Sequence, residues 1–337
     1  MLAFLVETFN ITKRSVKIGL KKWGNYAPTM IWNEFGLIKS KSIINFLRTT
    51  QLTMKPFLNT TAVKTLQILN WVFFALMIFV NFLANYLPIN GKNTGELSNQ
   101  YPNLFVPAPV TFAIWGVIYL LVLVFCVKQS KSLFSRTLHL DTAEMVLAVG
   151  PLFIISCFLN ALWILTWHYE YQAVSVLVML GLLASLVAIN LRLEAIAPFV
   201  SKAARFVIKA PFGVYLGWIC VATVANATAA LVHFGWDGGG QSESFWTCAM
   251  IAIAALIVSF TLLKARNFYV GLAVIWAFVG IIIARQNAEV YQRFITWTAV
   301  FGIGLVGIVA FVEMSKAALR KQQIRPLETP LIVTTEM

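Results

Sequence analysis

Aromatic and amide side chains recur at helical spacing in three apolar segments of the sequence. Asn160 and Trp163, for example, are three residues apart, so in a helix they lie on one face. An aromatic row alone usually serves helix packing, but aromatic rows with a few amides and no charges favour a cavity for a flat, apolar molecule. The three rows are Trp115 with Tyr119, Asn160 with Trp163 and Trp167, and Tyr215 with Trp218, Ala222 and Asn226.

Asparagines are the main polar residues inside these apolar segments. Asn81 and Asn85 precede the rows, and Asn160 and Asn226 belong to them. A single asparagine in a membrane helix usually joins two helices, but beside aromatic rows these amides become candidate ligand contacts. Ionisable residues lie at segment ends or in loops, which argues against a proton pump, an ion-coupled antiporter or a channel for charged solutes.

Histidine and cysteine offer little further chemistry. His168 and His233 each end an apolar segment, so a haem held between them is one hypothesis and an interfacial position is the alternative. The 4 cysteines lie within apolar runs without a CxxC pair. We expect them to be small buried hydrophobes rather than disulfides or zinc ligands. No catalytic or metal-ligating residue is predicted.

The composition is that of an integral membrane protein. Of the 337 residues, 59% are hydrophobic and 12% are charged, whereas soluble domains average about 25% charged residues. Spanning a bilayer takes about 20 apolar residues, and without strand-like alternation the spans must be helices. The sequence predicts an all-α membrane protein with eight spans, at residues 66–88, 107–127, 145–168, 171–192, 211–233, 246–263, 267–285 and 294–313.

The basic residues predict the orientation of these spans. Of the 26 Lys and Arg residues, all except Lys92, Arg285 and Arg293 fall on the side of the two termini. The positive-inside rule then places both termini in the cytoplasm. The same placement explains the net charge of +13 without nucleic acid. We expect a bacterial cytoplasmic membrane, with an organellar membrane as the alternative.

The two ends of the chain are expected to lie outside the bilayer. Residues 1–65 form a basic segment, and residues 314–337 form a cytoplasmic tail. Within the first segment, residues 1–53 are open to three interpretations: a targeting segment, an amphipathic arm on the inner membrane surface, or an extension upstream of a natural start at Met54.

Three motifs resemble those of the TspO/MBR family, the tryptophan-rich sensory proteins and translocator proteins also called peripheral benzodiazepine receptors. PAPVTFAIWGVIYLLVLVFC (107–126) resembles the second helix of the family. LNALW (159–163) resembles the Leu-Asn-x-x-Trp motif of its third helix. PFGVYLGWICVATVAN (211–226) resembles its fifth helix, with a Trp followed eight positions later by an Asn. The fit is best to a larger subgroup with extra C-terminal helices.

This resemblance implies a five-helix bundle over 66–233 that holds an apolar cavity, followed by three additional spans over 234–313. Family members bind tetrapyrroles, sterols and synthetic aromatic amides. The loop 89–106 would cover the cavity and become ordered when ligand binds. By motif match, the cavity would be lined by Trp115, Tyr119, Asn160, Trp163, Trp218, Ala222 and Asn226.

Two departures from the family pattern narrow the expectation. The first loop of family members is usually rich in tryptophan, yet residues 89–106 contain none and offer Tyr101 and Phe105 instead. This argues against porphyrin breakdown. The Tyr-then-basic pattern that recognises sterols is absent from residues 227–245, so specific cholesterol binding is not expected.

The sequence therefore predicts a non-enzymatic membrane protein that binds, and senses or translocates, a lipophilic planar ligand such as a tetrapyrrole. No cofactor is required, and the expected partners are that small molecule and membrane lipids, with a homodimer left open. Two rival hypotheses are an eight-helix secondary transporter for a small solute and a haem-binding membrane enzyme.

The last three spans are expected to support the cavity without lining it. They carry small residues at packing intervals, including Gly280, Gly302, Gly304 and Gly307, and such residues let membrane helices approach closely. Trp276 is the exception, since it lies mid-span and could reach a ligand.

Overall fold

The computed structural model describes residues 60–87, 89–135, 139–198, 200–288 and 292–324. These residues belong to one compact unit. The interpretations of residues 1–53 and of Met54, and the end of the C-terminal tail, lie outside the described residues.

The prediction of an all-helical membrane protein with eight spans is confirmed. Eight helical segments are long and apolar enough to cross a membrane, and the described residues contain no strand. The spanning helices are α3 Thr60–Tyr86, α5 Ile114–Gln129 with the short 3-10 turns η4 Pro109–Ala113 and η5 Ser130–Ser132 at its ends, α6 Leu140–His168, α7 Gln172–Ile196, α8 Lys202–His233, α9 Glu243–Ala265, α10 Tyr269–Gln286 and α11 Arg293–Ile324.

Several helices extend beyond the apolar runs that predicted them. α8 begins at Lys202, nine residues before the expected start at 211, and α11 continues to Ile324. The extra turns contain charged residues that can remain helical outside the hydrocarbon, so the apolar run marks the span and not the whole helix. α6 is interrupted at Gly150, which has φ 45° and precedes Pro151.

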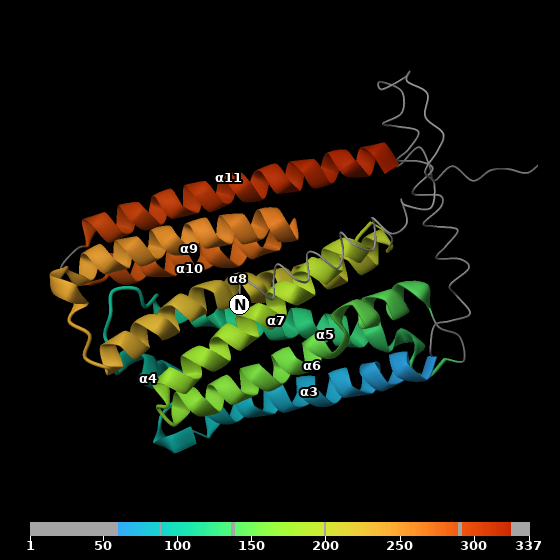
Figure 1. The fold of residues 1–337 in the computed structure, drawn as a ribbon, viewed down its shortest axis with the longest axis horizontal. Helices are drawn as coiled ribbons and strands as arrows, with labels where there is room; N and C mark the ends of the chain where they lie inside the picture. The colour runs from blue at the N-terminus through green and yellow to red at the C-terminus, as the bar shows by residue number, and fades with distance from the viewer. Residues whose placement is uncertain (1–59, 88, 136–138, 199, 289–291, 325–337) are drawn as a thin grey trace, which may run out of the picture. The chain divides into compact units, whose positions relative to one another are not determined.

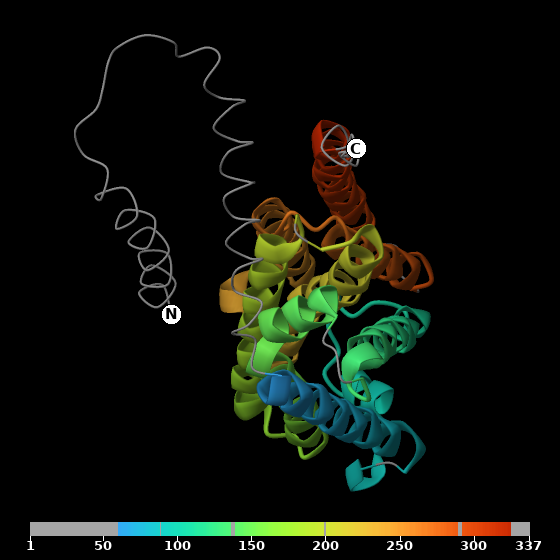
Figure 2. The ribbon, with the colours of Figure 1, turned by 90° about the vertical axis from the view of Figure 1, so that its right-hand side faces the viewer.

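The helices form two groups that meet along α8 and α10. α3, α5, α6, α7 and α8 pack on one another, and α9, α10 and α11 form a second group. Figures 1 and 2 show α3 and α11 on opposite sides of the unit, with α8 between them. α8 is the most enclosed spanning helix, since 78% of its span is buried.

Glycines allow α10 to lie very close to α8 and to the turn η4. A Cβ atom placed on Gly217 of α8 would lie 2.2 Å from the carbonyl oxygen of Val270, and one on Gly280 of α10 would lie 2.0 Å from Oγ1 of Thr111. Real Cβ atoms are never so close to backbone or side-chain oxygen, so these contacts require glycine. A Cβ atom placed on Gly304 or Gly307 of α11 would meet no atom within 4 Å, so neither glycine makes a close contact with another described helix.

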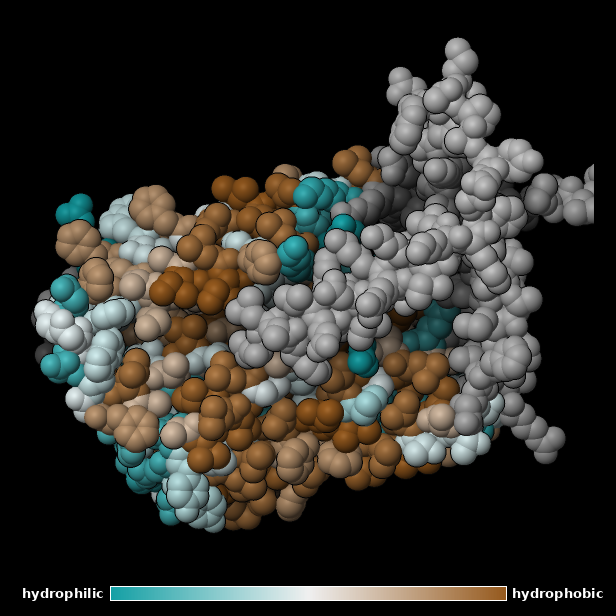
Figure 3. Space-filling model, in the orientation of Figure 1, coloured by the Kyte–Doolittle hydropathy of each residue, from teal (hydrophilic) through white to brown (hydrophobic). Residues whose placement is uncertain are grey.

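The outer surface of the helices is apolar along most of its length. Exposed side chains such as Phe79, Leu120, Leu177 and Phe301 point away from the bundle. Figure 3 shows hydrophobic side chains across the middle of this face and hydrophilic ones gathered at the end that carries α4 (Thr94–Asn99) and the start of α9. This distribution is expected for a protein whose middle lies in lipid.

Candidate ligand-binding site

A pocket of about 470 Å³ lies where α3, α5 and α6 meet the segment between the first two spans. Ligand pockets of drug-sized molecules occupy about 300–1,000 Å³. Five of the residues expected from the sequence line it: Asn81, Asn85, Trp115, Tyr119 and Trp163. The lining that the sequence did not predict consists of Asn93, Thr94, Gly95, Glu96, Ser98, Asn99, Val106, Pro107, Pro109, Phe112 and Ile164.

Trp115 is the centre of the aromatic wall of this pocket. Its ring stacks on Tyr119 and Trp163, with ring centroids 5.6 and 6.3 Å away. It also meets the rings of Tyr215 and Trp218 edge to face, at 6.1 and 6.0 Å. Trp115 itself is half-buried, so part of its indole surface remains free beside the pocket. Such a surface suits a second flat ring.

A chain of amides and phenols crosses four helices behind this wall. The Tyr119 hydroxyl donates to Oδ1 of Asn81 (2.6 Å), and Nδ2 of Asn81 donates to Oδ1 of Asn160 (2.7 Å). Nδ2 of Asn160 then donates to the Tyr215 hydroxyl (2.8 Å). Asn160 has no exposed surface. The chain therefore orients Asn81 and Tyr119, and Asn160 acts one layer behind the pocket lining.

A second pair of hydrogen bonds orients Trp163. Its Nε1 donates to Oδ1 of Asn226 (2.9 Å), and Nδ2 of Asn226 donates to Oγ of Ser175 (2.9 Å). Asn226 is buried and does not line the pocket. Its role in the structure is to fix the indole of Trp163, which does line it.

Trp218 and Ala222 also lie outside the pocket lining. Trp218 is buried between Trp115 and Phe112, whose ring it meets at 5.9 Å. Ala222 is half-buried, and it is not among the lining residues of this pocket. Of the sequence-based candidates, Asn160, Trp218, Ala222 and Asn226 are thus supporting or neighbouring residues.

The segment after α3 folds over the pocket mouth, as the sequence predicts. Asn93 caps α4 by accepting from the Glu96 backbone N–H, and the Glu96 side chain accepts from the Asn93 N–H. This reciprocal capping explains how a six-residue helix forms here, and the Asn-x-x-Glu spacing could have revealed it. The ordering of this segment on ligand binding stays a prediction.

His168 and Glu170, at the turn between α6 and α7, anchor this covering segment. Nε2 of His168 lies 3.1 Å from Oγ1 of Thr94, and its Nδ1 lies 3.2 Å from the carbonyl oxygen of Ile89. Glu170 forms an ion pair with Lys92 (2.7 Å) and accepts from the Tyr101 hydroxyl (3.2 Å). His168 is fully buried, whereas Tyr169 and Tyr171 of the same turn are exposed.

These contacts shift the pKa values of two groups, Glu170 and Tyr101. The hydrogen bond from Lys92 lowers the pKa of Glu170 below its usual range. Burial raises the pKa of Tyr101, and the Glu170 carboxylate adds to this shift. The Glu170 carboxyl is therefore ionised at neutral pH.

A haem between His168 and His233 does not fit this geometry. Both ring nitrogens of His168 already have partners in the covering segment. Binding iron would require that one of these contacts break. Within the described residues, no three His, Cys, Asp or Glu side chains gather as a metal site.

α10 reaches the start of α5 and fixes its position. Nε1 of Trp276 donates to the carbonyl oxygen of Thr111 (2.9 Å), and the Ala108 N–H donates to the carbonyl oxygen of Gly280 (2.9 Å). Trp276 thus supports the turn that leads to Phe112 and Trp115, and it does not line the pocket. None of the described residues of α9, α10 and α11 lines this pocket.

Comparison with models of protein families gives a match. The family model described as "TSPO-like protein" matches residues 67–312, which include α9, α10 and most of α11 as well as the first five spans. No curated protein and no solved structure matches the chain. Because the match covers more than half of an eight-span helical chain, the protein is an integral membrane protein and belongs to the TSPO-like family.

Proposed function

We propose that this protein binds a lipophilic planar molecule, such as a tetrapyrrole, in the pocket beside Trp115, and senses or translocates it. One observation carries the proposal: stacked aromatic rings and oriented amides from different helices converge on one pocket of suitable size. The rings supply a face for a flat ligand. The amides of Asn81 and Asn85 supply polar contacts that fix its orientation.

The chemistry of the lining supports binding rather than catalysis. Glu96 is the single charged residue among the described lining residues, and its carboxylate caps α4. A general acid or base needs a titratable group within reach of the substrate, and a carboxylate already used as a cap is poorly placed for this. We therefore propose a receptor or carrier without enzymatic activity.

The proposed location is the bacterial cytoplasmic membrane, with both termini in the cytoplasm. The distribution of Lys and Arg supports this orientation. The pocket and its covering segment then face the outer side. A ligand could reach the pocket from the outer leaflet, past the exposed side chain of Asn85.

The rival function, secondary transport of a small solute, is favoured by one feature. α6 is interrupted at Gly150, and broken helices commonly form transport sites near the middle of the membrane. The pocket lies at the other end of α6, beside Trp163 and Ile164. Uptake of a planar ligand into proteoliposomes that contain the protein would distinguish transport of that ligand from binding alone.

Tryptophan fluorescence of the purified protein tests the proposal. Trp115 and Trp163 line the pocket, so a bound tetrapyrrole or aromatic amide should quench their emission in a saturable way. Titration of a panel of both classes, with a linear aliphatic amide as a control, identifies the preferred shape. Absence of saturable quenching by every planar compound would refute the proposed site.

A further inference from the structure

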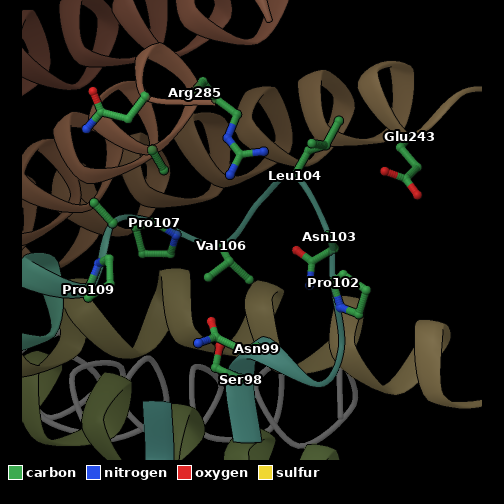
Figure 4. Close-up of a pocket in the computed structure, with 13 residues that line it drawn as sticks. Ser98, Asn99, Pro102, Asn103, Leu104, Val106, Pro107, Pro109, Glu243 and Arg285 are labelled. Carbon is green, nitrogen blue, oxygen red and sulfur yellow. The ribbon is translucent and has the colours of Figure 1, made fainter. Parts of the chain in front are cut away.

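A second pocket, of about 510 Å³, lies on the other side of the segment that covers the first. It is enclosed by residues 98–109 of that segment together with the outer ends of α9 and α10. Figure 4 shows the Arg285 side chain, from α10, pointing into this pocket toward Val106. The family motifs on the first five spans do not include this residue.

Arg285 has no counter-ion within the described residues. No ion pair or hydrogen bond to its side chain is found there, and its Nε atom is buried without a partner. Glu243 also lines the pocket, but it is exposed, and in Figure 4 it lies at the far end from the guanidinium. Glu289 lies outside the described residues. A guanidinium presents a fork of N–H donors that matches a carboxylate or phosphate.

Two simpler explanations for an arginine at this position do not account for the direction of the Arg285 side chain. A cation in the last turn of a helix is favoured by the helix dipole, and a long basic side chain at a membrane surface commonly extends toward water. Either explanation accounts for an arginine at the end of α10. Neither requires a side chain that points into a pocket with its Nε enclosed.

The two pockets share one wall. Ser98, Asn99, Val106, Pro107 and Pro109 line both of them. A ligand with a flat ring beside Trp115 and a flexible arm could therefore pass this wall and place the end of its arm near Arg285. The first pocket provides no cation for such an arm, since Glu96 is its single charged lining residue among those described.

We infer that Arg285 binds an anionic arm, a carboxylate, of the ligand whose ring lies against Trp115. The inference rests on the proposed function and adds the class of ligand: amphipathic, flat and negatively charged at one edge. It also gives the C-terminal group of helices a direct part in recognition through one residue.

The test uses the full-length protein in phosphatidylcholine nanodiscs and two probes with the same ring. Protoporphyrin IX carries two carboxylates, and its dimethyl ester carries none. Quenching titrations with each probe are made for the unaltered protein, Arg285→Gln, Arg285→Lys and the control Arg293→Gln. Arg293 is exposed at the start of α11, on the same side as Arg285, and lines neither pocket.

We expect Arg285→Gln to weaken binding of the free acid about tenfold, the usual effect of losing one charge-assisted contact, and to leave the ester unchanged. Arg285→Lys should keep most of the affinity for the acid, and Arg293→Gln should change neither probe. Equal effects of Arg285→Gln on acid and ester, or no effect on either, would overturn the inference about Arg285 but not the proposed function. If neither probe binds the unaltered protein, the proposed function fails as well.

The phosphate of a lipid headgroup could bind to the same guanidinium. An additional experiment distinguishes this lipid phosphate from the carboxylate of the ligand. The acid titration is repeated with phosphatidylglycerol added to the nanodiscs. A similar change in the unaltered protein and in Arg285→Gln is expected if Arg285 binds the ligand carboxylate. A loss of affinity in the unaltered protein that is absent in Arg285→Gln would assign Arg285 to the lipid headgroup and overturn the inference.

Discussion

Trp115 combines the two properties that a ligand-stacking residue needs. It is held by rings on several sides, and it keeps part of its own surface free beside the pocket. Rings that are fixed in advance lose little conformational entropy when a ligand stacks on them. Tyr215 and Trp218, which hold Trp115 without lining the pocket, are therefore expected to contribute to binding without touching the ligand.

Trp115→Ala should weaken the binding of a planar aromatic ligand about tenfold, because stacking on one aromatic side chain contributes about 1–3 kcal/mol. Trp297→Ala is the matched control, since Trp297 is exposed on α11 and lines neither of the two pockets described above. The measurement is the dissociation constant from a quenching titration. An unchanged constant for Trp115→Ala would remove this residue from the site.

Asn160→Ala should lower both stability and affinity, since Asn160 lies behind the pocket. The change leaves Nδ2 of Asn81 and the Tyr215 hydroxyl without their shared partner. An unpaired buried polar group costs about 1–3 kcal/mol, so we expect a lower melting temperature and a severalfold loss of affinity. Thermal unfolding followed by circular dichroism measures the first effect. An unaltered melting temperature would show that the amide chain is not structural.

At the level of elements, the polar contacts of the covering segment between α3 and α5 gather at one turn, while Leu97, Tyr101 and Phe105 of the segment are buried in the core. Lys92, Tyr101, Asn90 and Thr94 all contact His168 or Glu170. Segments that cover a pocket commonly control access to it by opening and closing. We therefore expect this segment to open by breaking the contacts with Glu170 and His168.

Glu170→Gln should increase hydrogen exchange of the amides of residues 89–106 at neutral pH, because the ion pair with Lys92 is lost. The unaltered protein should show the same change on acidification. A carboxyl with a lowered pKa in the folded state stabilises above its usual pKa of 4.5 and loses that effect as pH falls below it. Protection factors compared between pH 7 and pH 3.5 check this. Equal protection in both variants at pH 7 would contradict it.

Close contact between α8 and α10 joins the two groups of helices. Gly217→Ala should destabilise the protein by about 1–3 kcal/mol, the usual cost of overpacking, because the new methyl group would meet the carbonyl oxygen of Val270. Gly304→Ala is the control, since nothing lies within 4 Å of its added Cβ. The melting temperatures of the two variants, measured in the same detergent, test this prediction. Similar values would mean that the backbone moves apart without cost.

At the scale of the whole molecule, the topology can be tested by cysteine labelling. Asn99→Cys should react with a membrane-impermeant maleimide in intact cells, because positive-inside placement puts residues 89–106 outside. Lys131→Cys, on the far end of α5, should react only after the cells are permeabilised. The unaltered protein supplies the background, since three of its four cysteines are buried and Cys248 is half-buried. The reverse pattern would invert the topology.

The sequence by itself determined the helical class, the eight spans and the family. These properties depend on local quantities, namely the length of an apolar run and the spacing of motif residues, which a single chain displays directly. It also placed Trp115, Tyr119 and Trp163 on the right helix faces. Periodicity assigns a residue to a face, and that was sufficient for these residues because their faces border the pocket.

Only the tertiary structure decided which of these residues line the pocket and which support it. Asn160 shares a helix face with Trp163, which lines the pocket, yet neighbouring helices cover Asn160, because a helix face meets different partners along its length. Asn226 is buried on α8, and none of the described residues of that helix lines the pocket. The buried position of His168 under residues 89–94 and the position of Arg285 beside residues 98–109 depend on segments far apart in the chain. Such contacts follow from how the helices pack, and spacing within one helix does not contain that information.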